Sequence, residues 1–322
     1  LQLSLDYTNI ILIGVIPMLL GLGANAALIA KGDTKSYRNT LVFGFVLNLI
    51  LDPLFIYGWG FIPEFGFKGV AYATILIQFF TFLYIVYKLY KTDLLNFKTP
   101  KMFLPDIRIY KKLVIQALPM SLNMFTMSLG TMLIMYFVSF YGYKTVAAFG
   151  IGYRVEQIIL LPMLGLNTAV SAIVANNYGA KNFDRITEVI HKALKYGYIM
   201  SCIGIVILFF FGKYIIMAFD NDTEVINTAY TYVMIESIIF FAFITIFIAN
   251  STLQGIKQPF IIPYVSLYRQ IIMPFILLYI AVVYFECSVT TAWILIGIII
   301  YSAAIWIYIY MKRKLKELKI KI

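Results

Sequence analysis

Residues 7–30 read YTNIILIGVIPMLLGLGANAALIA, a run of 24 residues without a charged side chain. A helix that crosses a membrane needs about 20 consecutive, mostly apolar residues. A helix that is apolar on every side must also be surrounded by lipid or by a large core. This run therefore predicts a membrane-spanning helix and decides the fold class of the chain.

The same composition extends over the rest of the chain. Of the 322 residues, 62% are hydrophobic and only 13% are charged, whereas a soluble domain carries about 25% charged residues. Nine segments qualify as spans, at residues 7–30, 37–57, 67–90, 111–140, 147–176, 186–212, 224–253, 259–285 and 289–311. We expect an all-α, polytopic membrane protein with nine transmembrane helices.

The distribution of basic residues predicts the orientation of these helices. If the loop around Asp33 is cytoplasmic, 21 of the 26 Lys and Arg residues lie on the inside, as the positive-inside rule requires. We expect a multi-pass protein of the bacterial inner membrane with a cytoplasmic C-terminus. The net charge of +11 then needs no nucleic-acid partner. We expect the basic tail from Lys312 to lie against the headgroups of the lipid bilayer, and a solvated helix end is the open alternative.

The chain also contains an internal repeat. Shifted by 225 residues, Tyr7 and Asn25 overlay Tyr232 and Asn250 without a gap. Internal repeats are typical of secondary transporters. If the second repeat begins near Lys111, the first would begin about 110 residues before the first residue, which leaves room for about three more helices. We therefore expect an N-terminally truncated part of a twelve-helix protein.

Several stretches resemble the MATE (multidrug and toxin extrusion) family of transporters over essentially the whole chain. They are AKGDTK (30–35), NLILDPLFIYG (48–58), GVAYAT (69–74), AFGIGYR (148–154), NNYGA (176–180) and LQG (253–255). The resemblance implies two lobes around a central cleft. It assigns residues 1–90 to helices four to six of the N-terminal lobe, 91–110 to a cytoplasmic inter-lobe linker, and 111–322 to helices seven to twelve of the C-terminal lobe.

The resemblance also implies a function. It predicts a secondary active multidrug efflux antiporter that exports cationic or amphipathic drugs and toxins in exchange for Na⁺ or H⁺ by alternating access. Such a xenobiotic transporter would work as a monomer without a cofactor. The alternative within the same superfamily is a flippase for lipids or lipid-linked oligosaccharides, which would carry a more cationic cleft. Here the basic residues inside spans are chiefly Arg154 and Arg269.

Asp52 is the sharpest candidate for cation binding. It lies about 8 Å before the outer end of its helix, and Asn48 lies one turn earlier on the same face. An acid at this depth is costly and marks a functional candidate. Its oxygens suit Na⁺, or burial lets the carboxyl carry H⁺. Alternatively, Asp52 only caps the helix end. The positions 225 residues later, Met273 and Leu277, are apolar, which favours a function confined to the first half.

The family pattern extends this candidate site. In one branch of MATE transporters the cation site uses an Asp on the first helix, Asn-x-x-x-Asp on the fifth and a Thr on the sixth. The last three match Asn48, Asp52 and Thr74, whereas the first-helix Asp would precede this chain. In another branch the acids lie in the second lobe. The corresponding positions here, Met127 and Phe243, are apolar, which argues against a cation site there.

Five residues are candidates for the substrate cleft: Glu156, Arg154, Glu236, Met127 and Arg269. Charged side chains within spans normally face a bundle interior or a water-filled cavity. Arg154 and Glu156 are two residues apart, so they do not face each other on a helix. For each charged residue a structural polar network is the open alternative. For Met127 the choice lies between an adaptable ligand surface and ordinary packing.

The residues that an enzyme would need are missing from the pattern. His191 is the single histidine and lies in a polar stretch, so neither a Ser-His pair nor a zinc site can form within the membrane. Asp33 and Asp52 are predicted at opposite membrane faces and cannot form an acid pair. Cys202 and Cys287 make neither a disulfide framework nor a metal motif. We therefore predict no enzyme and no metal site beyond Na⁺.

Overall fold

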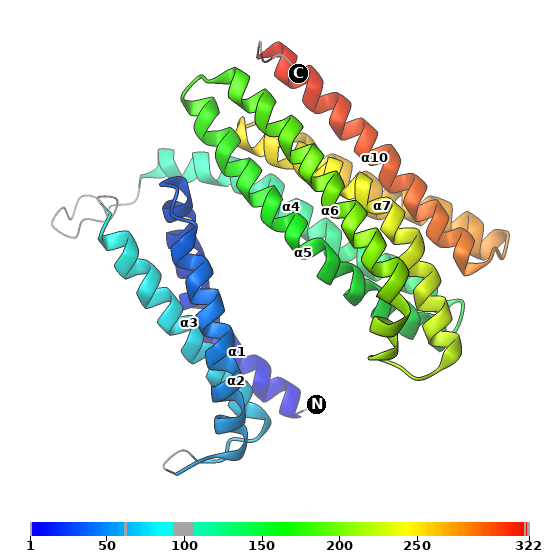
Figure 1. Ribbon diagram of the computed structural model, residues 1–322, viewed down its shortest axis with the longest axis horizontal. Helices are drawn as coiled ribbons and strands as arrows, with labels where there is room; N and C mark the ends of the chain where they lie inside the picture. Colours follow the sequence, from blue (N-terminus) through cyan, green and yellow to red (C-terminus); the bar gives the residue numbers. More distant parts are fainter. Residues whose placement is uncertain (1, 61–62, 93–105, 319, 321–322) are drawn as a thin grey trace. The chain divides into compact units, whose positions relative to one another are not determined.

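The computed structural model describes residues 2–60, 63–92, 106–318 and 320. Within these ranges the elements are helices, and nine spans are long and apolar enough to cross a membrane. This confirms the all-α prediction and the nine predicted segments. The chain divides into two compact units, Leu1–Pro105 and Asp106–Ile322, which are described separately (Figure 1).

The first unit is a three-helix group. It consists of α1 (Gln2–Ala30), α2 (Lys35–Tyr57) and α3 (Phe67–Tyr90). Both α1 and α2 pack against α3. A Cβ atom on Gly69 would lie 2.5 Å from the carbonyl carbon of Phe55, and one on Gly44 would lie 3.0 Å from Ile77 Cγ2. The absence of a side chain at these glycines allows the close approach, and the two contacts show that α2 and α3 run antiparallel.

Asp33 organises the start of α2. Its carboxylate accepts hydrogen bonds from the backbone N–H of Lys35 (3.1 Å) and of Ser36 (3.0 Å), and from Ser36 Oγ (2.6 Å). The two bonds from backbone N–H groups satisfy amides that have no partner inside the helix. Hydrogen bonding from Ser36 lowers the pKa of Asp33, so at neutral pH the charged side chain stabilises the helix start.

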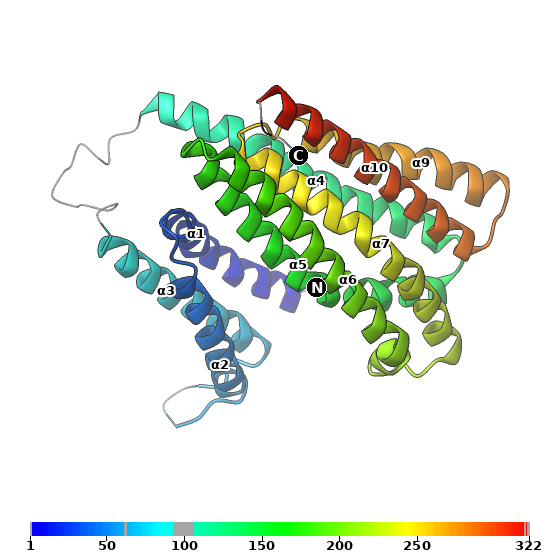
Figure 2. The same cartoon turned by 45° about the horizontal axis from the view of Figure 1, so that its top comes forward.

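The second unit holds the remaining spans. Its long helices are α4 (Ile107–Ser139), α5 (Tyr143–Gly179), α6 (Phe183–Met217), α7 (Thr223–Gly255) and α10 (Val289–Glu317). Helix α7 is the most buried of the described spans, because α5, α6 and α10 all pack against it (Figures 1 and 2). The core of the unit is therefore built around α7.

The span predicted at residues 259–285 is not a regular helix. It forms α8 (Ile261–Leu267), a π-helical turn (Tyr268–Ile272), α9 (Met273–Leu278) and a second π-helical segment (Tyr279–Tyr284). Proline removes a backbone donor from a helix, and Pro274 lies at the start of α9. A π turn changes the phase of the residues that follow it, and such turns are frequent at functional sites.

Helix packing reproduces the repeat seen in the sequence. In the first unit, α1 and α2 pack against α3; in the second, α7 and the α8–α9 span pack against α10. The offset of 225 residues relates these helices in the same order. Asn25 on α1 and Asn250 on α7, which the offset pairs, each carry a buried side-chain oxygen without a hydrogen-bond partner among the described residues. The repeat therefore extends from sequence to packing.

Candidate functional site

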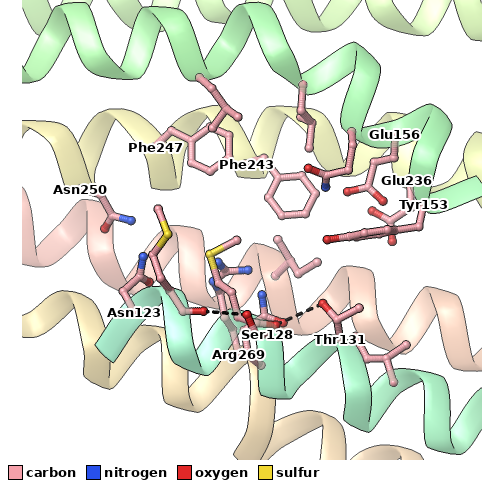
Figure 3. A pocket seen from close by; sticks show the side chains of 18 of the residues that line it. Asn123, Ser128, Thr131, Tyr153, Glu156, Glu236, Phe243, Phe247, Asn250 and Arg269 are labelled. Carbon is pink, nitrogen blue, oxygen red and sulfur yellow. Dashed lines mark hydrogen bonds between the residues drawn. The ribbon is translucent and has the colours of Figure 1, made fainter. Parts of the chain in front are cut away.

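The second unit contains a cavity of about 630 Å³. Residues from α4, α5, α7, the first π turn and α10 line it. Its wall is rich in flexible and aromatic side chains. They include Met124 and Met127, and also Phe243 and Phe247, which Figure 3 shows. Thioether side chains adapt to ligands of different shape, and aromatic faces attract cations. The wall therefore suits bulky amphipathic molecules.

Two acidic side chains lie beside each other in this cavity, Glu156 from α5 and Glu236 from α7 (Figure 3). They are only 5% and 3% exposed. Tyr232 Oη donates a hydrogen bond of 2.7 Å to Glu156 Oε2. A Cβ atom on Gly152 would lie 2.4 Å from Tyr232 Cδ1, so the glycine makes room for the ring. Tyr232 therefore orients one carboxyl group of the pair.

Glu236 is the less satisfied member of the acidic pair. Its Oε2 is buried and has no hydrogen-bond partner within the described residues. Glu156 is close enough to act on it electrostatically. Two carboxylates with like charge and little water repel each other, and each is costly to bury without a partner. The arrangement is therefore stabilised by a proton or a positively charged group.

The structure brings together four of the five predicted cleft residues. Glu156, Glu236, Met127 and Arg269 all line the cavity. Arg154 does not: it is exposed and is not among the lining residues. Residues two positions apart in the sequence of a helix differ by about 200° around its axis. Arg154 therefore points away from the wall that holds Glu156.

Although the positions Met127 and Phe243 are apolar, this cavity does contain acidic side chains. Both residues line it, but its carboxyl groups come from Glu156 and Glu236. Sequence reasoning also missed Tyr232, which entered only as a member of the repeat. Its signal was present: it lies one helical turn before Glu236, and residues four apart share a face.

The predicted cation site lies in the first unit. Asn48 and Asp52 are partly buried on α2, and each has a buried side-chain oxygen without a partner in the described ranges. Thr74 on α3 donates its hydroxyl to Val70 O at 2.8 Å. The antiparallel register of α2 and α3 places Thr74 level with residues 47–50, the turn that holds Asn48. The three-residue site remains a prediction.

A clustered metal site is not visible in the described part of the chain. No group of three or more His, Cys, Asp or Glu side chains there could hold a metal ion. Oxygen atoms from a single acid and an amide, as at Asp52 and Asn48, remain available to a hard cation such as Na⁺.

Comparisons with known proteins point to one family. A family profile described as MatE matches residues 119–280. The chain is 30% identical over 243 residues to the probable multidrug resistance protein YoeA of Bacillus subtilis, covering 73% of this chain and 51% of that protein. It is 25% identical over 319 residues to the probable multidrug resistance protein NorM of Thermotoga maritima, covering 96% of this chain and 67% of that protein.

The solved structures agree with the sequence relatives. An outward-facing multidrug resistance MATE family transporter of the MOP superfamily matches with a TM-score of 0.91 and 25% identity. The match covers 99% of this chain and 70% of that one. The chain spans about half the length of the first curated relatives that it matches.

Proposed function

The chain belongs to the MatE family, and on that premise we propose that the protein is a secondary active exporter of cationic or amphipathic small molecules. One observation carries the proposal: a cavity of about 630 Å³ with Met and Phe side chains in its wall and the carboxyl pair Glu156 and Glu236 inside it. The apolar wall would hold the body of a drug-like molecule, and the carboxyl pair would hold its positive group.

The acidic pair also favours export of drugs over the lipid-linked alternative. A site for a pyrophosphate group needs several basic side chains, because phosphates are recognised by Arg and Lys clusters. The cavity contains two acids, and Arg269 is its only basic lining residue in the described chain. This balance of charge is better matched to a cation than to a diphosphate.

Ion coupling is the second part of the proposal. Asp52 with Asn48 and Thr74 would bind Na⁺ or H⁺ that enters from outside. Asp52 and Asn48 each have a buried side-chain oxygen without a partner among the described residues, which supports this role. A bound cation can drive transport only if it binds one state of the protein more tightly than the other. Cation binding would favour the state that releases the drug, and its release inside would reset the transporter.

The membrane setting follows from the same proposal. The nine spans found within the described residues make a multi-pass membrane protein. The excess of Lys and Arg in one set of loops supports the bacterial inner membrane, with the C-terminus in the cytoplasm. The exporter would function as a monomer, without a prosthetic group.

The coupling assignment is tested with the full-length protein in proteoliposomes. We expect Asp52→Asn to abolish the dependence of drug efflux on a Na⁺ or H⁺ gradient, because it keeps the shape of the side chain and removes its charge. Glu236→Gln should weaken drug binding and keep the gradient dependence. Asp6→Asn is the matched control, since Asp6 is a half-exposed acid of the same unit paired with Lys68 at 2.8 Å. Normal gradient-driven efflux by Asp52→Asn would contradict the assignment.

A further inference from the structure

The cavity holds one charge that cation export does not use, the guanidinium of Arg269. This side chain is 5% exposed and lines the cavity. It forms no hydrogen bond or ion pair with any described residue, and its Nε is buried without a partner. Arg269 lies eight residues after Ile261, so it is about 12 Å into its span. Among the described residues, this buried cation has no counter-charge.

The backbone around Arg269 is held on both sides. Tyr268 Oη lies 3.0 Å from Ser302 Oγ on α10, and Ser266 Oγ hydrogen-bonds the side chain of Asn123 on α4. The next residue, Gln270, packs directly against Gly130. A Cβ atom on Gly130 would lie only 2.7 Å from Gln270 Cβ. These contacts position the first π turn, which presents Arg269 and Gln270 to the cavity.

The two kinds of charge in the cavity do not neutralise each other. Neither Glu156 nor Glu236 lies within ion-pair distance of Arg269, since no such pair exists among the described residues. Figure 3 shows the carboxyl pair beside Tyr153, whereas Arg269 lies on another part of the wall. Leaving a buried charge uncompensated costs several kcal/mol. Arg269 is therefore expected to receive its counter-charge from a molecule that enters the cavity.

We propose that Arg269, assisted by Gln270, is an anion subsite that binds the carboxylate of a zwitterionic amphipathic cargo, while Glu156 and Glu236 hold its cationic group. The guanidinium presents planar, forked N–H donors that match a carboxylate bidentately, and Gln270 adds an amide donor. The proposal rests on the proposed export function and narrows its substrate class. A cargo that carries both charges would satisfy both buried groups at once.

The test uses two fluorescent probes with one chromophore: rhodamine B, which carries a cation and a carboxylate at pH 7.5, and its ethyl ester, which carries only the cation. Binding to the full-length purified protein is measured by fluorescence anisotropy. We expect Arg269→Gln to weaken rhodamine B binding about tenfold or more, because a charge-assisted bond is lost. Its affinity for the ester should be unchanged or higher. Arg269→Lys should retain part of the preference, and Arg154→Gln, on the exposed side of α5, should change neither affinity.

Other outcomes overturn the proposal in recognisable ways. Equal losses for both probes in Arg269→Gln would make Arg269 a structural residue, and no loss for either probe would remove it from the site. A preference of Arg269 for anionic phosphatidylglycerol in nanodiscs, without any preference for rhodamine B, would assign the counter-charge to lipid instead. If the wild-type protein bound neither probe, the export function itself would fail.

Thermal stability supplies an independent readout. Arg269→Met removes an unpaired buried charge and keeps most of the side-chain volume. The ligand-free variant should melt at the wild-type temperature or above, since replacing uncompensated charge by apolar groups is neutral or stabilising. A marked fall in its melting temperature would show that the arginine has a structural partner, which contradicts an open anion subsite.

Discussion

Removal of one charge from the acidic pair should weaken the binding of an amphipathic cation strongly. Glu236→Gln is the cleanest change, because no hydrogen bond of Glu236 with a described residue is lost with it. Glu156→Gln keeps an oxygen that can accept the bond from Tyr232 Oη. Both substitutions therefore preserve shape, and a change in affinity reports the loss of charge.

The magnitude follows from Coulomb's law. A cation about 5 Å from one carboxylate, with an effective dielectric constant of about 20, gains about 3 kcal/mol. A difference of about 1.4 kcal/mol is tenfold in affinity, so each substitution should raise the Kd about 100-fold. The double variant should lose less than the sum of the two, because neighbouring groups that share one ligand are not additive.

The assay is a titration of rhodamine B ethyl ester into the full-length protein in detergent. Glu224→Gln is the matched control, since Glu224 is a well-exposed acid bound to Lys144 at 2.7 Å and lies outside the cavity. Tyr232→Phe should cost about 1 kcal/mol, the value of one hydrogen bond, or about fivefold in Kd. If both single Glu variants stayed within threefold of wild type, or if Glu224→Gln matched them, the acidic pair would not be the cation site.

Three further outcomes test the fold and the orientation. Gly152→Ala should lower the free energy of unfolding by about 1–3 kcal/mol, seen as a lower melting temperature, and should weaken cation binding. The reason is that the new Cβ would displace the Tyr232 ring. A loss of stability with unchanged binding would show that Gly152 matters for packing and not for the site. With the two native cysteines replaced, a cysteine at position Asn221 should be labelled from outside intact cells and one at Arg185 only after permeabilisation, and the reverse pattern would invert the topology. Asp33→Ala should lower the melting temperature at neutral pH and have little effect once the pH falls through the lowered pKa of Asp33. The reason is that the carboxylate contributes stability only while it is ionised. An equal effect at both pH values would show that the charge of Asp33 does not stabilise the start of α2.

The spans could be predicted from sequence because hydropathy is local. A run such as residues 7–30 is apolar whatever surrounds it, so length and composition alone indicate a crossing. The repeat could also be detected in the sequence. The offset that overlays Asn25 on Asn250 also relates the helix pairs that pack together. The family followed from short stretches that keep their order and spacing. None of these predictions depends on which face of a helix points toward its neighbours.

The membership of the cavity depended on helix rotation and on contacts between distant helices. Glu156 and Arg154 are both ionisable and nearly adjacent, yet only Glu156 lines the cavity. Tyr232 reaches Glu156 from 76 residues away, and a π turn that apolar periodicity does not reveal sets the place of Arg269. Composition and spacing were enough to predict the nine spans that the described residues contain and the positions of the charges along the chain. Only the tertiary structure decided which charges meet, because helix phase and packing, unlike hydropathy, are not properties of one segment.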